Sequence, residues 1–312
     1  MAHMVETMAY AGAVPWHGLG KPVPADLSTN QMLDAAGLNW TVEKVPLYYM
    51  ADAKKNKVPG KEALIRSSDN TLLDVVGSDW NPLQNSEAFE FFNDFVMAGD
   101  MEMHTAGALE NGRRVWALAK VKDSFEVFKN DKIDQYLLLS NPHKYGQSID
   151  VRMTPIRVVC NNTLTLALDS NVERMVKINH RQVFDADYVK ETLGVAKEKL
   201  ESYKEAAKFL GSKRYTEKTI MDYFQKVFPT NSKKEEAQQS RNATTAMEVL
   251  HTQPGAKYGE GTWWQGFNTV TYMTDHLLGR STDTRLTSSW FGINRKKKID
   301  ALELAVEMAE AA

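Results

Sequence analysis

Two arginines interrupt a half-apolar stretch in the middle of the chain, YGQSIDVRMTPIRVVCNNTLTLAL at residues 145–168. Arg152 and Arg157 lie on either side of Pro155, in a segment where a buried strand would carry no charge. Guanidinium groups form paired hydrogen bonds to phosphates, and they are costly to bury without a partner. We therefore expect both side chains to face water or a bound anion.

The alternation of apolar residues in this stretch slips by one position at Thr154-Pro155. Apolar residues occupy odd positions before this dipeptide and even positions after it. Because side chains alternate between the two faces of a strand, the slip predicts an extra residue or a bend at the proline, which cannot donate to the ladder. Arg152 and Arg157 would then share one face, about 15 Å apart at roughly 3.3 Å per residue. This separation suits two phosphates of one extended nucleic-acid strand.

Further cations and one aromatic residue surround this stretch. Arg113 and Arg114 follow an Asn-Gly turn, so we expect at least one of them to face solvent. Tyr145, in a second turn, could stack on a base. The nucleic-acid-binding residues predicted on this basis are Arg113, Arg114, Lys144, Tyr145, Arg152, Arg157, Lys177, Arg181, Arg295 and Lys296.

The densest basic run is RKKK at residues 295–298. At the start of a helix these cations lie at the unfavourable end of the helix dipole, and a bound anion would offset this cost. A solvated helix face is the alternative. For the whole array of cations, the competing interpretation is an ordinary charged surface that pairs with Asp134, Asp150 and Glu173.

The sequence contains no complete catalytic, metal-binding or cofactor-binding motif. None of its seven histidines forms an H-E-x-x-H pair, and it lacks a P-loop, a G-x-S-x-G elbow and a dinucleotide fingerprint. His17, in WHGLG at residues 16–20, could act as an acid or base or could fix a loop. Asp275-His276 is a pair without a third member. We predict no catalytic residues, no metal and no cofactor.

The composition is that of an average globular protein, with 43% hydrophobic and 25% charged residues among 312. Lys and Arg number 38 against 40 Asp and Glu, and the net charge of −2 argues against a polycation that coats nucleic acid. Any anion-binding site must therefore be a local patch. The single cysteine, Cys160, indicates a reducing compartment without disulfides. No leader or membrane span is evident, so we expect a soluble protein.

Turn and capping residues predict a run of strands and short helices before residue 183. Ser28 fits the N-cap of a helix, and Asn111-Gly112 is a strong hairpin signal. The Gly- and Pro-rich residues 1–24 indicate an ordered arm or loop. The other expected elements are a helix at 29–38, strands at 40–50, 62–68 and 71–80, a helix at 82–98, a hairpin at 101–121 and a hairpin that joins 134–141 to 148–159.

The chain becomes helical after residue 183. We expect helices at 185–214, 216–228, 262–279 and 295–312, with a polar linker near 230–242 and a connecting segment at 284–294. The fold class is therefore α+β: a mostly antiparallel β-meander with a packed helix, followed by a helical C-terminal region. The domains that this division predicts are an α+β core with an N-terminal arm at 1–183 and a helical region at 184–312.

Several blocks of the sequence resemble one known family. They are ETMAYAGAVPWHGLGKPV, WNPLQNSEAFEFFNDFV, TPIRVVCNNTLTLAL, and WWQGFNTVTYMTDHLLG with SSWFG. Together they resemble phage- and plasmid-associated proteins catalogued as a domain of unknown function. The resemblance implies a role in the DNA metabolism of mobile elements, in the cytoplasm of a bacterial host. No catalytic residues carry over from it.

The expected sheet and the missing P-loop are also similar to single-strand annealing proteins of the RecT, Redβ and Erf kind. This likeness implies a homo-oligomer, a ring or a filament, that holds single-stranded DNA without ATP. The leading hypothesis is therefore a non-enzymatic protein that binds and anneals single strands. The alternatives are a phage interaction protein that antagonises a host defence or modulates a host enzyme, and a nuclease or hydrolase whose site includes His17 and His104.

Overall fold

The computed structural model describes residues 4–12, 15, 18–157, 162–163, 176–230, 240–279 and 282–311. Side chains are described for these residues except at 123, 157, 162–163, 190–200 and 282–283. The chain forms two compact units. The first comprises Met1–Lys122, Tyr136–Met153 and Met175–Leu193, and the second comprises Asp123–Gln135, Thr154–Arg174 and Gly194–Ala312.

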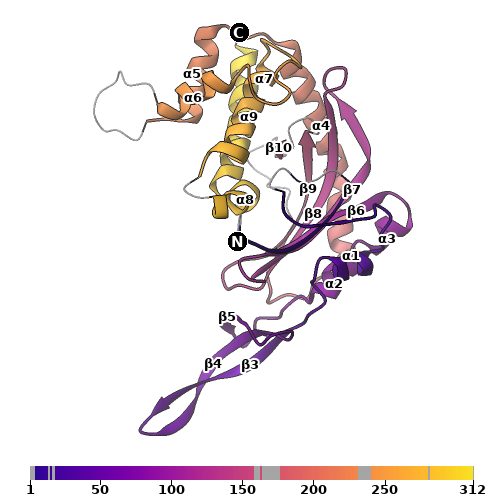
Figure 1. Cartoon of the computed structure of the whole chain (residues 1–312), viewed down its shortest axis with the longest axis vertical. Coiled ribbons are helices and arrows are strands. Elements are labelled where there is room, and N and C mark those ends of the chain that lie inside the picture. Colours follow the sequence, from indigo (N-terminus) through magenta and orange to yellow (C-terminus); the bar gives the residue numbers. More distant parts are fainter. Residues whose placement is uncertain are drawn as a thin grey trace. The chain divides into compact units, whose positions relative to one another are not determined.

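The larger of the described sheets is mixed, with mostly antiparallel strand pairs (Figure 1). Its strand order is β10-β9-β8-β7-β6-β1-β2, with β11 paired to β9. The pair β1–β2 is parallel, and β1–β6 and β6–β7 are antiparallel. The bounds are β1 Val5–Ala11, β2 Lys21–Val23, β6 Met101–Leu109, β7 Arg114–Glu126, β8 Lys132–Pro142, β9 Ile149–Arg157, β10 Asn162–Thr163 and β11 Val176–Ile178.

A second, three-stranded sheet has the order β3-β4-β5. Short helices of the first unit pack on the large sheet, where α1 and α3 contact β6. Ser28 caps α1 through a capping box with Gln31, as the sequence predicts. The bounds are α1 Thr29–Ala35, β3 Val42–Ala51, β4 Lys54–Arg66, β5 Leu72–Gly77, α2 Asn85–Glu90 and α3 Asn93–Met97.

The helices of the second unit enclose an aromatic core. Trp263, Trp264, Tyr223 and Phe267 are fully buried there, and Trp264 Nε1 donates to Asp131 Oδ2 at 2.9 Å. The bounds are α4 Ala186–Ser212, which begins in the first unit, α5 Glu217–Val227, α6 Arg241–Val249, α7 Trp263–Tyr272, the π-helix η2 Met273–Leu277, α8 Thr282–Phe291 and α9 Ile293–Glu310. No helix in the described part of the chain is long and apolar enough to cross a bilayer.

The predicted α+β class is confirmed, with helices concentrated in the C-terminal region. The hairpin at Asn111-Gly112 is also confirmed, because Asn111 and Gly112 adopt φ of 58° and 81° between β6 and β7. The division at residues 183 and 184 stays a prediction. Of the predicted linker, residues 231–239 lie outside the described residues.

Three expectations about individual elements are wrong. The N-terminal residues do not form a loop throughout, because β1 pairs with both β6 and β2, and the Gly- and Pro-rich sequence begins only after it. The helix expected at 82–98 is divided into α2 and α3, where Phe92 N donates to Phe89 O at 3.0 Å in a tightened turn. The connection expected at 284–294 is mostly the helix α8, which buries Leu286 and Ser289 three residues apart.

Candidate nucleic-acid interface

A two-stranded ribbon, here called the arm (residues 47–60), is an exposed basic element of the first unit. It consists of the outer parts of β3 and β4, which pair with each other but not with β5, since β5 pairs only with residues 61–65 of β4. In Figure 1 this ribbon extends beyond β5. Its side chains are therefore not covered by a third strand.

The arm interleaves lysines with exposed apolar and aromatic side chains. Tyr48, Tyr49 and Met50 are 48%, 53% and 69% exposed. Lys54, Lys55 and Lys57 are exposed, and Lys55 Nζ lies 4.1 Å from the centroid of the Tyr48 ring. The sequence indicates the second strand of this ribbon only weakly. KKNKVPG resembles a polar loop, and the strand predicted after residues 40–50 begins only at residue 62.

The arm has a local excess of positive charge in a chain whose net charge is −2. Its three lysines accompany one carboxylate, that of Asp52 in the turn. Within the part of the chain that the structure describes, none of the three lysines forms an ion pair. They are thus available to neutralise phosphates.

The geometry of the arm is set by its turn and by a large bulge at its base. Asp52 and Ala53 both have positive φ, 48° and 60°, as a two-residue hairpin turn of this hand requires. The register shifts between Pro46 and Tyr48, where β4 contains additional residues that include Pro59 and Gly60. Prolines cannot donate to the ladder, and Gly60 has a φ of +66°, so the chain can change direction here.

Three of the predicted binding residues gather at the base of the arm. Lys61 Nζ lies 5.7 Å from the centroid of the Tyr145 ring, and Tyr145 N donates to Asp74 Oδ2 at 2.9 Å. Arg113 Nη2 lies 3.4 Å from the same Asp74 oxygen. Lys144, the third, pairs with Glu110 at 3.2 Å. The base of the arm is therefore polar and nearly balanced in charge, with Tyr145 59% exposed.

The expectation that Arg152 faces water is wrong. Arg152 is 6% exposed, and its Nη1 donates to Asp150 Oδ2 at 2.7 Å. This pairing with Asp150 is the one that the competing interpretation predicted. The side chain of Arg157 lies outside the described residues, so a shared face for the two arginines stays a prediction. Arg152 supplies no exposed phosphate contact, and its replacement would leave a buried carboxylate without this partner.

Arg114 is also unsuited to contact an exposed ligand. It is 7% exposed, its Nη1 donates to Ser140 Oγ at 2.7 Å, and its Nη2 donates to Gln147 Oε1. Burial lowers the pKa of Arg114, and the nearby carboxylates of Glu110 and Asp150 raise it. Arg114 therefore stabilises the polar interior of the sheet.

The remaining predicted residues belong to two different units. Lys177 is exposed on β11, and exposed Arg181 pairs with Asp79 at 2.9 Å. Arg295 and Lys296 belong to α9 in the second unit, where Lys296 pairs with Asp300 at 3.2 Å. Their common role with the arm stays a prediction.

The basic run at 295–298 is explained within the second unit without a bound anion. Lys297 Nζ donates to the carbonyl of Val227, the last residue of α5, at 2.9 Å, and a cation is favourable at such a C-terminus. Burial lowers the pKa of Lys297. Lys298 is fully buried, so the run is not a uniformly solvated face.

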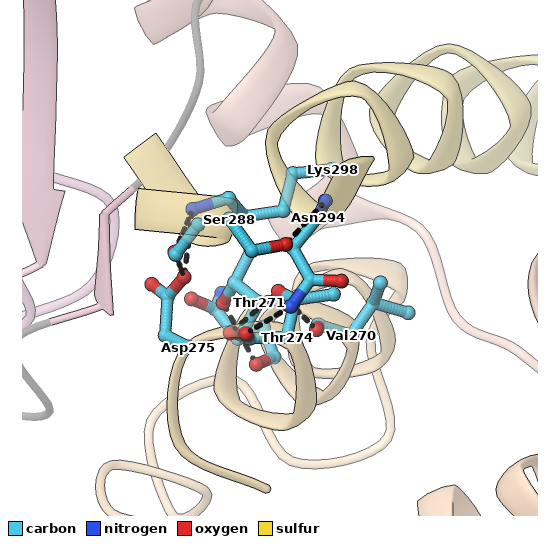
Figure 2. A network of polar contacts seen from close by, with 9 residues as sticks. Val270, Thr271, Thr274, Asp275, Ser288, Asn294 and Lys298 are labelled. Atoms are coloured by element: carbon cyan, nitrogen blue, oxygen red, sulfur yellow. Dashed lines mark hydrogen bonds and ion pairs between the residues drawn. The ribbon is translucent and has the colours of Figure 1, made fainter. Parts of the chain in front are cut away.

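Lys298 belongs to a network that joins η2, α8 and α9 (Figure 2). Its Nζ donates to Asp275 Oδ1 at 2.7 Å and to Ser289 Oγ at 3.0 Å, and Ser289 also contacts Asp275. Asn294 Nδ2 donates to the carbonyl of Thr274 at 2.9 Å. Asp275 is thus part of a buried ion pair and has no exposed position from which to act on a substrate.

Two buried histidines, His143 and His180, stabilise the residues at the base of the arm. His143 Nε2 lies 3.1 Å from Asn85 Oδ1, and Asn85 Nδ2 donates to the carbonyl of Leu38 at 3.0 Å. His180 stacks on Trp80 with ring centroids 4.0 Å apart. His143 N also donates to the carbonyl of Arg113 at 2.9 Å. This network fixes the turn that presents Lys144 and Tyr145.

Both rings are neutral at physiological pH. Burial, with a smaller effect of neighbouring His180, lowers the pKa of His143 to about 3. Burial lowers the pKa of His180 to about 4, although hydrogen bonds to the carbonyls of Asn81 and Pro142 oppose the effect. Each ring therefore has a lower pKa in the folded state than the ordinary value of about 6.5 that it has when unfolded.

We predict that the protein becomes less stable as the pH falls from 6.5 to 5, because His143 and His180 are buried. Between pH 6.5 and pH 5 the unfolded state binds protons and the folded state does not, so the free energy of unfolding falls as the pH falls. The expected slope for each ring rises to about 1.4 kcal/mol per pH unit as the pH approaches 5. Urea titrations from pH 7 to pH 5 measure it. His143→Gln should reduce the slope, and a slope equal to that of wild type would contradict the assignment.

The other residues that the sequence singles out for acid–base or thiol chemistry are His17, His104 and Cys160. His17 and Cys160 lie outside the described residues. His104 packs edge-on against Tyr136, with ring centroids 4.9 Å apart. Among the described residues, no group of three or more His, Cys, Asp or Glu side chains is placed to hold a metal ion.

Comparison with known proteins identifies a family but not an activity. The model of the family described as Domain of unknown function (DUF932) matches residues 72–290, well over half of the chain. No curated protein matches the chain. The matched range begins after the arm, so the chemistry of the arm must be judged from its own residues.

Proposed function

Because the chain belongs to the DUF932 family, a domain of unknown function, we propose an activity from the arm itself: it binds single-stranded nucleic acid, without catalysis and without ATP. The observation that carries the proposal is the combination of exposed tyrosines and unpaired lysines on one projecting ribbon. Lysines neutralise phosphates, and aromatic rings stack on bases whatever their identity.

The exposed rings favour a single strand over a duplex as the ligand. Tyr48 and Tyr49 can stack only on bases that are not already stacked and paired inside a helix. Tyr145 and Lys61, at the base of the arm, extend the same combination of ring and cation along the first unit. The arm therefore replaces the predicted shared face of Arg152 and Arg157 as the physical basis for binding nucleic acid.

Strand annealing, homo-oligomerisation and a phage or plasmid setting are further parts of the proposal. Annealing requires that bound bases remain able to pair, and a backbone held by lysines leaves the base edges accessible. The alternative is a phage interaction protein that antagonises a host defence or modulates a host enzyme. Its exposed Tyr48, Tyr49 and Met50 would then contact a protein.

The proposal predicts a specific loss of affinity when the arm lysines are neutralised. In Lys54→Gln/Lys55→Gln/Lys57→Gln, loss of up to two phosphate contacts per bound strand should weaken binding of a labelled single-stranded oligonucleotide about 25-fold at roughly 0.1 M salt. Fluorescence anisotropy measures the dissociation constant. Circular dichroism should show an unchanged fold, because all three side chains are exposed.

The matched control removes three exposed lysines from the second unit, in Lys208→Gln/Lys218→Gln/Lys226→Gln. This variant has the same net charge as the arm variant, so an effect of overall charge would weaken both equally. Loss of binding in the arm variant alone supports the proposal. Equal affinities for wild type and both variants would refute it, and salt-insensitive association with a host protein would favour the alternative.

A further inference from the structure

The two tyrosines of the arm lie on opposite faces of the ribbon. Tyr48 is paired with Lys57 and lies two residues from Met50, which is paired with Lys55, so these side chains share one face. Tyr49 lies on the other face, together with Lys54. Each face therefore offers one stacking ring and at least one lysine.

Both faces are open to a ligand at the same time. The two rings are similarly exposed, at 48% and 53%, and no third strand pairs with the outer ribbon. On the first face Lys55 lies over the Tyr48 ring, which places a cation directly beside a stacking surface. A continuous single strand on one face would leave the second ring and its lysine unused.

The tip of the ribbon differs from its faces in charge. The turn contains the only carboxylate of the arm, Asp52, and a carboxylate repels a phosphate backbone. A backbone is therefore favoured along each face and disfavoured around the tip. This pattern suits two strands that diverge on either side of the ribbon better than one strand that wraps around its end.

We propose that the preferred ligand is a forked nucleic acid, a duplex from which two unpaired tails diverge. One tail lies on the Tyr48 face and the other on the Tyr49 face. This inference rests on the proposed binding of single-stranded nucleic acid and adds the shape of the ligand. Since the duplex links the tails, binding of the first raises the effective concentration of the second.

The test compares three labelled DNA probes that share one duplex: a fork with two non-complementary tails, a single-tailed duplex and a blunt duplex. Fluorescence anisotropy with the full chain should show the fork bound at least about tenfold more tightly than the single-tailed probe. The ratio of these two affinities measures whether the second face of the arm binds the second tail.

Two variants remove one face each. With either variant, the affinity for the fork should be about equal to that for the single-tailed probe, because the remaining face can hold only one tail. The variants are Tyr48→Ala/Lys55→Gln/Lys57→Gln and Tyr49→Ala/Lys54→Gln. The control Lys208→Gln/Lys218→Gln should keep the wild-type ratio.

The outcomes separate this inference from the function on which it rests. Single-tailed and forked probes that bind wild type equally would overturn the fork and leave single-strand binding intact. A fork preference that survives both face variants would also overturn it. If no probe binds wild type, the nucleic-acid function itself fails, and the fork with it.

Discussion

Replacement of Lys298 by methionine should destabilise the second unit by about 3–5 kcal/mol, because it leaves the carboxylate of Asp275 buried without its cation. Lys298 is 0% exposed and Asp275 is 4% exposed, so water cannot take the place of the lost partner. The network of Figure 2 would also lose the hydrogen bond from Lys298 to Ser289. Urea unfolding, followed by tryptophan fluorescence, measures the change.

Two further variants distinguish a buried ion pair from a general effect of charge. Lys298→Met/Asp275→Asn should recover much of the lost stability, since both charges are then absent. Lys296→Met, which breaks an exposed pair with Asp300 on the same helix, should cost no more than about 0.5 kcal/mol. A Lys298→Met protein as stable as wild type would contradict the burial of this pair.

Removal of both arm rings, in Tyr48→Ala/Tyr49→Ala, should weaken single-strand binding by roughly 5-fold to 150-fold. Stacking contributes about 1–3 kcal/mol per base, and a strand held on one face of the arm stacks on one ring. The conservative variant Tyr48→Phe/Tyr49→Phe should bind nearly as well as wild type, because it keeps the aromatic faces. Anisotropy titrations with one labelled oligonucleotide compare all of these proteins.

Tyr188→Ala is the control for this experiment, because Tyr188 is 58% exposed on α4, comparable to the arm tyrosines. It should leave binding unchanged. The two alanines in the arm should also leave the salt dependence unchanged, since stacking releases no counterions. Wild-type affinity in Tyr48→Ala/Tyr49→Ala would show that the rings do not contact bases.

Local chemistry in the sequence predicts much of the fold. Asn111-Gly112 and Ser68-Asp69-Asn70 mark hairpin turns, and Asn70 adopts a φ of 61° between β4 and β5. Thr216 opens α5 with a capping box, as its position at the start of TEKTIMDYFQKVF indicates. These signals are reliable because a turn or a cap depends on a few neighbouring residues.

The burial of a charged side chain depends on contacts with residues distant in the sequence, so local patterns do not predict it. Lys298 belongs to a run of four basic residues, and only the packing of α7, η2, α8 and α9 shows that it is buried beside Asp275. Arg152 likewise lies in a strand whose face is covered, where Asp150 neutralises it. In both cases the sequence shows a cation, and the tertiary fold decides whether water reaches it.

The second strand of the arm escapes prediction for the opposite reason. This strand, Lys54–Val58, lacks the apolar alternation by which a half-buried strand is identified, because both of its faces are solvent-exposed over most of its length. The turn of the arm, Asp52-Ala53, also lacks the glycine that usually marks a two-residue hairpin. The aromatic and basic residues were visible in the sequence, but only the pairing of β3 with β4 brings them together.

The salt dependence of single-strand binding tests the role of the arm most directly. The logarithm of the association constant should fall linearly with the logarithm of salt concentration, with a slope of about −0.7 for each phosphate neutralised. We expect Lys54→Gln/Lys55→Gln/Lys57→Gln to have a slope smaller in magnitude than wild type by about 1.4, from the two lysines of one face, and Lys208→Gln/Lys218→Gln/Lys226→Gln to have the wild-type slope. Identical slopes for wild type and the arm variant would contradict the claim that the arm lysines contact phosphates.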